Sequence, residues 1–184
     1  MLHQIPNVIT VVRVLLIIPL VYLLWQENYF YAVGIFVIAG LSDGIDGFLA
    51  KHFHWESRFG AILDPLADKA LLVSTILLLC LKAQLSWWLF AVVTLRYLLI
   101  VIGAVLYHRA LGPYKMSPSR LSKANTFLQI LLVFSVLVSL GVFPLYDWYL
   151  HTLVILVYIS TVSSGIHYIA LWGGRYRRNK QLNR

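Results

Sequence analysis

Four aspartates lie close together in a chain that has few acidic residues. The 184 residues include only seven Asp and Glu, and four of them fall in one short stretch: Asp43, Asp46, Asp64 and Asp68. Asp43 and Asp46 are three residues apart, and the second pair is four apart, so on a helix each pair shares one face. Carboxylates at that spacing repel each other unless a cation neutralises them. Four oxygen donors suit Mg²⁺ or Mn²⁺ better than Zn²⁺.

Small residues accompany these aspartates. Gly47 and Ala50 follow the first pair, and Gly60 precedes the second. Small side chains let helices approach each other closely and let a bulky ligand reach the backbone. Pro65 lacks an amide hydrogen, which costs little only near a helix start. We therefore expect a helix that begins or bends beside Asp64.

The rest of the chain is strongly apolar. It is 60% hydrophobic and 12% charged, with a mean hydropathy of +0.80. Soluble domains have roughly 25% charged residues, and about 20 apolar residues suffice to cross a bilayer. The predicted fold is an all-α integral membrane protein in which one domain, residues 1–184, crosses the membrane six times. The expected spans are 7–26, 30–50, 61–82, 86–107, 123–143 and 149–172.

Lysines and arginines gather in alternate connections. Most follow the second, fourth and sixth expected spans, and the net charge of +8 is therefore expected at one membrane face. The positive-inside rule places both termini and these basic loops in the cytosol, with the aspartates on the same side. The expected location is a bacterial inner membrane or a mitochondrial inner membrane. Attraction to anionic lipid explains the charge, so no nucleic-acid partner is expected.

Three basic residues lie inside the expected spans, away from their ends: Arg13, Lys69 and Arg96. Charge inside a membrane is costly and usually faces the protein interior or a wet cavity. We expect these side chains to form buried ion pairs or to serve the site.

The spacing of the acidic stretch resembles the signature of the CDP-alcohol phosphatidyltransferases, D-x2-D-G-x2-A-R followed by eight residues and G-x3-D-x3-D. The chain matches every fixed position except one, since Lys51 stands where the family has arginine. Lysine keeps the charge but loses the planar fork of the guanidinium. The chain length, the six expected spans and the N-terminal segment IPNVITVVR also resemble the family.

This resemblance implies transfer of a phosphatidyl group from CDP-diacylglycerol to an alcohol, with release of CMP. By position it implies that the four aspartates bind the metal ions, two of Mg²⁺ or Mn²⁺, and that Asp68 is also the general base. It implies a homodimer, and a CDP pocket formed by Asp43, Gly47, Ala50, Lys51 and Gly60.

A second segment of the sequence indicates which alcohol accepts the phosphatidyl group. Residues 122–129 read S-K-A-N-T-F-L-Q and resemble the S-K-x-N-T-x-x-Q segment of the family's cardiolipin synthases, which use phosphatidylglycerol. The alternative acceptor is glycerol 3-phosphate, which would give phosphatidylglycerophosphate. Arg96, Lys123 and Asn125 are the expected acceptor-binding residues, because basic groups suit a phosphate.

Two other protein classes also place carboxylates in membrane helices. A membrane transporter does so, but it does not need the aspartates grouped at one face with this glycine spacing. An aspartate-rich prenyltransferase binds pyrophosphate through Mg²⁺, but it has two separated aspartate motifs and more spans. The single continuous motif favours the phosphatidyltransferase.

Overall fold

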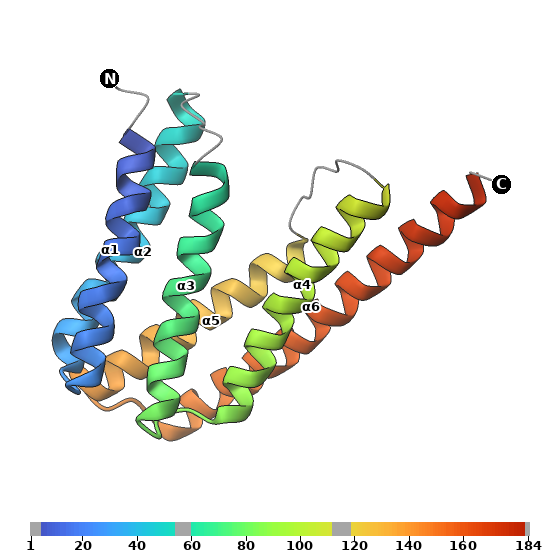
Figure 1. The fold of residues 1–184 in the computed structure, drawn as a ribbon. Coiled ribbons are helices and arrows are strands. Elements are labelled where there is room, and N and C mark those ends of the chain that lie inside the picture. The colour runs from blue at the N-terminus through green and yellow to red at the C-terminus, as the bar shows by residue number, and fades with distance from the viewer. Residues whose placement is uncertain (1–4, 54–59, 112–118, 183–184) are drawn as a thin grey trace. The chain divides into compact units, whose positions relative to one another are not determined.

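A computed structural model describes the backbone of residues 5–53, 60–111 and 119–182, and the side chains of residues 11–42, 68–103 and 119–171. Within these ranges the chain forms six helices (Figure 1): α1 (Ile5–Trp25), α2 (Tyr29–Phe53), α3 (Gly60–Leu81), α4 (Trp87–Leu111), α5 (Arg120–Gly141) and α6 (Asp147–Leu182). The predicted all-α fold is confirmed for the described residues, and most helix ends lie within a few residues of the expected spans.

The end of α6 differs from the prediction. The apolar run ends at residue 172, but the helix continues to Leu182. The added segment, rich in arginine and lysine, includes good helix formers, and backbone hydrogen bonding does not require apolar side chains. The change from apolar to polar residues at 172 therefore gave the end of the expected membrane span, whereas the helix itself ends at Leu182.

The second helix of the acidic motif, α3, begins at Gly60, ahead of Asp64 and Pro65. The helix thus starts four residues before Asp64, not at it. Pro65 is the sixth residue of α3, past the first turn, so its missing amide hydrogen removes one backbone hydrogen bond of the helix. Ser119 starts α5 in a different way, since its hydroxyl accepts a hydrogen bond from the Ser122 amide at 3.1 Å. This is the usual contact of an N-cap serine.

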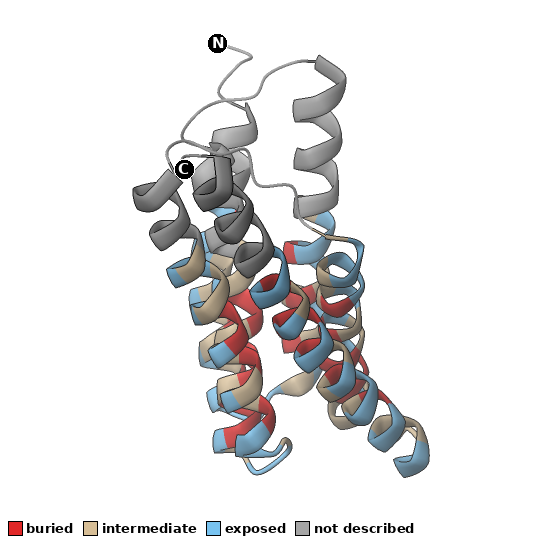
Figure 2. Ribbon diagram, turned by 90° about the vertical axis from the view of Figure 1, so that its right-hand side faces the viewer, coloured by how far each residue is buried: buried red, intermediate tan, exposed pale blue. Residues whose placement is uncertain are grey.

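The chain divides into two compact units. The first unit consists of Met1–Ser86 and Val133–Leu150, and the second consists of Trp87–Leu132 and His151–Arg184. In the first unit, α1 packs against both α2 and α3. The buried residues recur at helical spacing, such as Leu20 and Leu24 on α1 and Ala32 and Phe36 on α2. Figure 2 shows the buried residues as red stripes on the described helices.

Two turns of the first unit end their helices in the same way. Glu27 and Ala83 have φ angles of 58° and 57°, the left-handed conformation that often follows a helix. The Asn28 and Gln84 amides donate to the carbonyls of Leu23 and Leu79 at 2.9 and 2.8 Å.

Lys82 joins the two turns, because its Nζ lies 2.8 Å from Glu27 Oε1. This exposed ion pair links the ends of α1 and α3.

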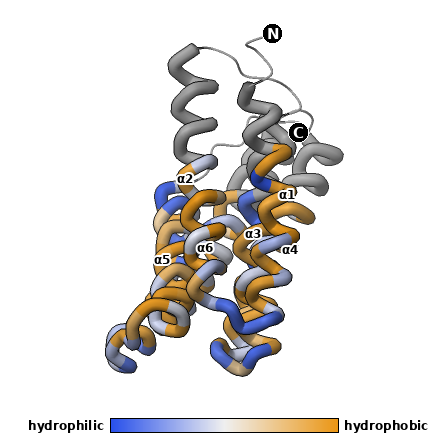
Figure 3. The backbone as a smooth tube through the Cα atoms, turned by 90° about the vertical axis from the view of Figure 1, so that its left-hand side faces the viewer, coloured by the Kyte–Doolittle hydropathy of each residue, from blue (hydrophilic) through white to orange (hydrophobic). Residues whose placement is uncertain are grey.

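Apolar side chains cover much of the outer surface of the described helices. Large exposed examples are Ile18 on α1, Ile38 on α2, Leu95 on α4, Phe127 on α5 and Ile155 on α6. Figure 3 shows that hydrophobic residues, in orange, recur along the described helices, with hydrophilic residues in blue between them. Among the described residues, two segments are long and apolar enough to cross a bilayer, Arg120–Gly141 and Asp147–Leu171. Three shorter apolar segments are Val11–Trp25, Tyr29–Ser42 and Trp87–Gly103.

Gly141 marks a close approach within the first unit. A Cβ atom at this position would lie 2.5 Å from the backbone carbon of Tyr29 and 2.6 Å from the amide nitrogen of Phe30. Backbone atoms cannot move aside as a flexible side chain can. Gly141 therefore lets the end of α5 contact the start of α2.

We predict that Gly141→Ala lowers the free energy of unfolding by roughly 1–3 kcal/mol, the usual cost of overpacking. The matched control is Gly34→Ala on α2, where no atom lies within 4 Å of the added methyl group. This control should gain up to about 1 kcal/mol, because alanine is the better helix former. Thermal unfolding of the purified protein in detergent measures both, and equal melting temperatures would contradict the close approach.

Candidate active site

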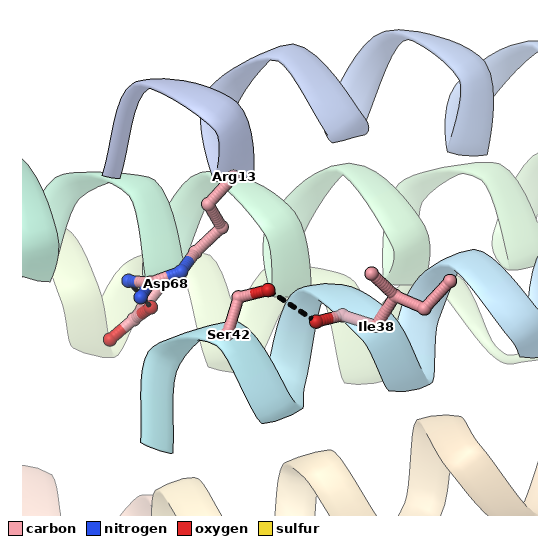
Figure 4. Close-up of polar contacts among 4 residues, drawn as sticks. All are labelled: Arg13, Ile38, Ser42 and Asp68. Carbon is pink, nitrogen blue, oxygen red and sulfur yellow. Dashed lines mark hydrogen bonds and ion pairs between the residues drawn. The ribbon is translucent and has the colours of Figure 1, made fainter. Parts of the chain in front are cut away.

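An ion pair joins α1 to α3 at Asp68. Arg13 Nη1 lies 2.9 Å from Asp68 Oδ1, a distance that satisfies both a hydrogen bond and an ion pair. Figure 4 shows the guanidinium of Arg13 extending from α1 to the carboxylate on α3. The Arg13 side chain is fully buried, whereas that of Asp68 is 38% exposed. One end of the pair is enclosed by protein and the other is accessible.

The local sequence explains why this pair is needed. Arg13 stands in the apolar run VVRVLL of α1, a helix that packs directly against α3. A buried guanidinium without a partner would be strongly unfavourable, because it has lost its water. Asp68 lies on α3 just before Leu71 and Leu72, and the burial of these two leucines holds this part of α3 in the packed interior of the first unit. The expected ion pairing of a basic residue within the apolar segments is therefore confirmed for Arg13.

Asp68 is the one aspartate of the motif whose side chain is described. The backbones of Asp43 and Asp46 lie in α2 and that of Asp64 lies in α3, so each pair has the helical spacing that the sequence predicted. Ser42, next to Asp43, donates its hydroxyl to the Ile38 carbonyl at 2.7 Å (Figure 4). The side chains of the remaining predicted site residues lie outside the described ones: Asp43, Asp46, Gly47, Ala50, Lys51, Gly60 and Asp64.

A potential metal site cannot be completed from the described side chains. Among them, no three His, Cys, Asp or Glu residues come together. Asp68 nevertheless provides what a metal ligand or a general base requires, a carboxylate that is held in place and still partly exposed. A set of four carboxylates is also the kind of donor set that Mg²⁺ or Mn²⁺ prefers.

The second unit contains a polar centre of its own. Eight residues form it, and we call them the polar seam: Arg96 and Tyr97 on α4, Ser122, Asn125 and Gln129 on α5, and Ser160, Thr161 and Ser164 on α6. Arg96 Nη2 donates to Ser122 Oγ at 2.6 Å and to Ser164 Oγ at 3.0 Å. Arg96 is only 4% exposed. One guanidinium thus joins α4 to both α5 and α6.

The remaining bonds between side chains of the polar seam also run between helices. The Tyr97 hydroxyl donates to Gln129 Oε1 at 2.6 Å. Asn125 Oδ1 accepts hydrogen bonds from Ser160 Oγ at 2.9 Å and from Thr161 Oγ1 at 2.8 Å. Asn125 and Gln129 are fully buried. Hydrogen bonds of this kind hold apolar helices together where water is excluded.

Donor capacity remains in the polar seam. Arg96 Nε, Asn125 Nδ2 and Gln129 Nε2 are buried and have no hydrogen-bond acceptor among the described residues. The partners of Arg96 there are hydroxyl groups, so its positive charge is solvated but not neutralised. A buried cation with spare donors suits an anionic group rich in oxygen.

The expected acceptor-binding residues occupy different environments. Arg96 and Asn125 belong to the polar seam, whereas Lys123 is exposed on α5. Sequence reasoning did not assign roles to Tyr97, Ser160 or Ser164, which the structure adds. The sequence did contain one indication of these residues. Ser160 and Ser164 are four residues apart, the spacing at which two side chains lie on one face of a helix.

Comparison with known proteins identifies the family. The family model described as CDP-alcohol phosphatidyltransferase matches residues 3–166, a range that contains all four motif aspartates, Arg13 and the polar seam. The chain belongs to the CDP-alcohol phosphatidyltransferase family. The resemblance that the acidic motif predicted is therefore confirmed.

Curated relatives in this family carry two kinds of name. Human cardiolipin synthase (CMP-forming) is 34% identical over 151 residues, which are 70% of this chain and 48% of the human protein. The CDP-diacylglycerol–glycerol-3-phosphate 3-phosphatidyltransferase of Wigglesworthia glossinidia brevipalpis is 31% identical over 160 residues, 78% of this chain and 85% of that protein. The Pseudomonas fluorescens protein of the same name is 44% identical over 89 residues, 47% of this chain and 45% of that protein. This chain spans about half the length of the human relative.

We predict that Tyr97→Phe destabilises the protein by about 1 kcal/mol, because Gln129 Oε1 would lose its donor in a buried position. Tyr158→Phe on α6 is the matched control, since the structure gives the Tyr158 hydroxyl no hydrogen bond within the described residues. Adding Gln129→Leu to Tyr97→Phe should recover part of the loss. Thermal unfolding in detergent measures all three variants, and equal losses for the two tyrosines would contradict the assignment.

Proposed function

We propose that this chain is an integral membrane enzyme that transfers a phosphatidyl group from CDP-diacylglycerol to an alcohol and releases CMP. The observation that carries this proposal is family membership over residues 3–166, with all four motif aspartates present. Asp68 adds structural support, because its carboxylate is anchored on one side and 38% exposed. The family match runs through both compact units, so we further propose that they form one catalytic domain.

Asp68 is proposed as the general base. The acceptor hydroxyl gives its proton to the Asp68 carboxylate, and the hydroxyl oxygen forms a bond to the phosphorus that carries diacylglycerol. The bond between that phosphorus and the bridging oxygen of the pyrophosphate breaks, and CMP leaves with the electron pair. A positioned carboxylate of this kind typically contributes about 10²–10⁴-fold to the rate.

The four motif aspartates are proposed to hold two Mg²⁺ or Mn²⁺ ions. When bound, such ions neutralise the charge of the pyrophosphate and of the attacking oxygen. The CDP pocket is proposed to contain Asp43, Gly47, Ala50, Lys51 and Gly60, where small residues leave room for the nucleotide. Lys51 supplies a positive charge for phosphate without the bidentate geometry of arginine.

Phosphatidylglycerol is the proposed acceptor, which would make the product cardiolipin. This rests on the resemblance of residues 122–129 to the cardiolipin synthases, and the human relative carries that name. Glycerol 3-phosphate is the second candidate, because other relatives are named for it. Arg96, Lys123 and Asn125 are proposed to bind the acceptor, since Arg96 and Asn125 keep buried donors available for phosphate or hydroxyl oxygens.

The proposed setting is a bacterial or mitochondrial inner membrane. Six helices would cross the bilayer, with both termini, the basic loops and the active site on the cytosolic or matrix side. The exposed apolar side chains of the described helices support this setting, because lipid would cover them. A homodimer is proposed from the family resemblance.

The acceptor is tested by offering labelled CDP-diacylglycerol to the purified protein with phosphatidylglycerol or glycerol 3-phosphate in parallel, with inositol phosphate and serine as controls. We predict that CMP release depends on phosphatidylglycerol and that labelled cardiolipin forms. Release only with glycerol 3-phosphate would establish the second candidate. No release with any alcohol would contradict the proposed function.

We predict that Asp68→Asn lowers kcat by about 10²–10⁴-fold while the protein stays folded, because asparagine has the same shape but cannot accept the proton. Asp147→Asn is the matched control, an acid in the first turn of α6 outside the motif, and it should keep normal transfer. CMP release measures activity, and circular dichroism with size-exclusion chromatography verifies folding. Near-normal turnover of Asp68→Asn would rule out the general-base role.

A further inference from the structure

Helix α1 contains none of the motif aspartates, yet one of its charged side chains contacts the last of them, Asp68. Arg13 Nη1 contacts Asp68 Oδ1 at 2.9 Å across a separation of 55 residues in the chain. Nothing in the motif on α2 and α3 indicates that a residue of α1 belongs to the site. The contact therefore raises the question of what Arg13 does for Asp68.

The two ends of this ion pair differ in their freedom to move. The Arg13 side chain is fully buried and is fixed by the packing around it, whereas the Asp68 side chain is 38% exposed. The terminal torsion of an unrestrained aspartate has broad, roughly two-fold preferences. A short hydrogen bond to a charged, immobile donor restricts that torsion. Arg13 is thus the fixed partner, and Asp68 is the residue whose orientation the pair determines.

We propose that Arg13 is a positioning residue for the reaction. Its Nη1 fixes Oδ1 of Asp68, so that the accessible part of the carboxylate keeps one orientation toward the acceptor hydroxyl. This inference rests on the proposed role of Asp68 as general base. Misplacing a reacting group by about 1 Å can cost on the order of 10²-fold in rate, so an orienting contact of this kind matters.

A purely structural role for Arg13 would have a different signature. If the pair only held α1 against α3, its loss would reduce stability and leave the turnover of the folded enzyme unchanged. Removing one partner of a buried ion pair is strongly destabilising when it leaves the other charge buried and uncompensated, and less so when that charge can be hydrated. Asp68 has access to water. Arg13→Met is therefore the informative variant, because it removes the orienting donor and fills the buried space.

The matched control is Lys82→Met in the same unit. Lys82 forms an ion pair of similar length, 2.8 Å to Glu27 Oε1, in a turn remote in sequence from the motif. Both variants remove a cation of the first unit and, among the described side chains, the ion pair that it forms. Only Arg13→Met removes a contact to Asp68.

The experiment measures kcat, KM for CDP-diacylglycerol and the melting temperature of each full-length variant in detergent. We expect Arg13→Met to lower kcat at least about tenfold with KM changed less than about twofold, while Lys82→Met keeps kcat within about twofold. Arg13→Lys retains the charge without the planar fork and should lie between Arg13→Met and the unaltered enzyme. In the Asp68→Asn background, Arg13→Met should cause no further loss of kcat, because the residue it orients has been removed.

The outcomes separate this inference from the proposed function. If Asp68→Asn is inactive but folded Arg13→Met turns over normally, the positioning role is overturned and the proposed function stands. If Asp68→Asn turns over normally, the base assignment and the positioning role are both overturned. If Arg13→Met does not fold, Arg13→Lys decides, since a reduced kcat at unchanged KM supports the role and a normal kcat overturns it.

Discussion

A charge buried among apolar helices needs a partner on a neighbouring helix, and this constraint governs both polar centres of the described structure. Water cannot solvate such a group, and the backbone of each helix has already used most of its own hydrogen-bonding capacity. Arg13 on α1 finds its partner on α3, and Arg96 on α4 finds hydroxyls on α5 and α6. Because each contact is directional, it fixes how a helix is rotated about its axis. Apolar packing alone tolerates more arrangements, since the hydrophobic effect has no direction.

The two arginines satisfy this constraint in different ways. Arg13 meets a carboxylate, so its charge is neutralised and the acid is held where it remains partly exposed. Arg96 meets two hydroxyl groups, which solvate its charge without cancelling it. The first arrangement suits a residue that takes part in proton transfer, and the second suits the recognition of an anion. Both properties fit the phosphate-containing substrates proposed for this protein. Each also follows from the general need of a buried charge for a partner on a neighbouring helix.

The family motif on α2 and α3 could be recognised from the sequence because its residues lie close together in the chain at fixed spacings. The spacing of Asp43, Asp46, Asp64 and Asp68 predicted shared helical faces, a metal-binding chemistry and a family, and the family match over residues 3–166 confirmed the last of these. The helix count and most helix ends also followed from the apolar runs, because about 20 apolar residues form a recognisable segment. The end of α6 was missed, since a polar segment can continue a helix that an apolar run began.

The partners of the polar side chains were decided only by the tertiary structure. The sequence showed that Arg13 and Arg96 needed partners, but it did not show that Arg13 meets Asp68 or that Arg96 meets Ser122 and Ser164. Nor did it show that Tyr97 donates to Gln129. Spacing along one helix determines which residues share a face. Contacts between helices depend on the rotation and axial register of both, which the packing of all their side chains determines together.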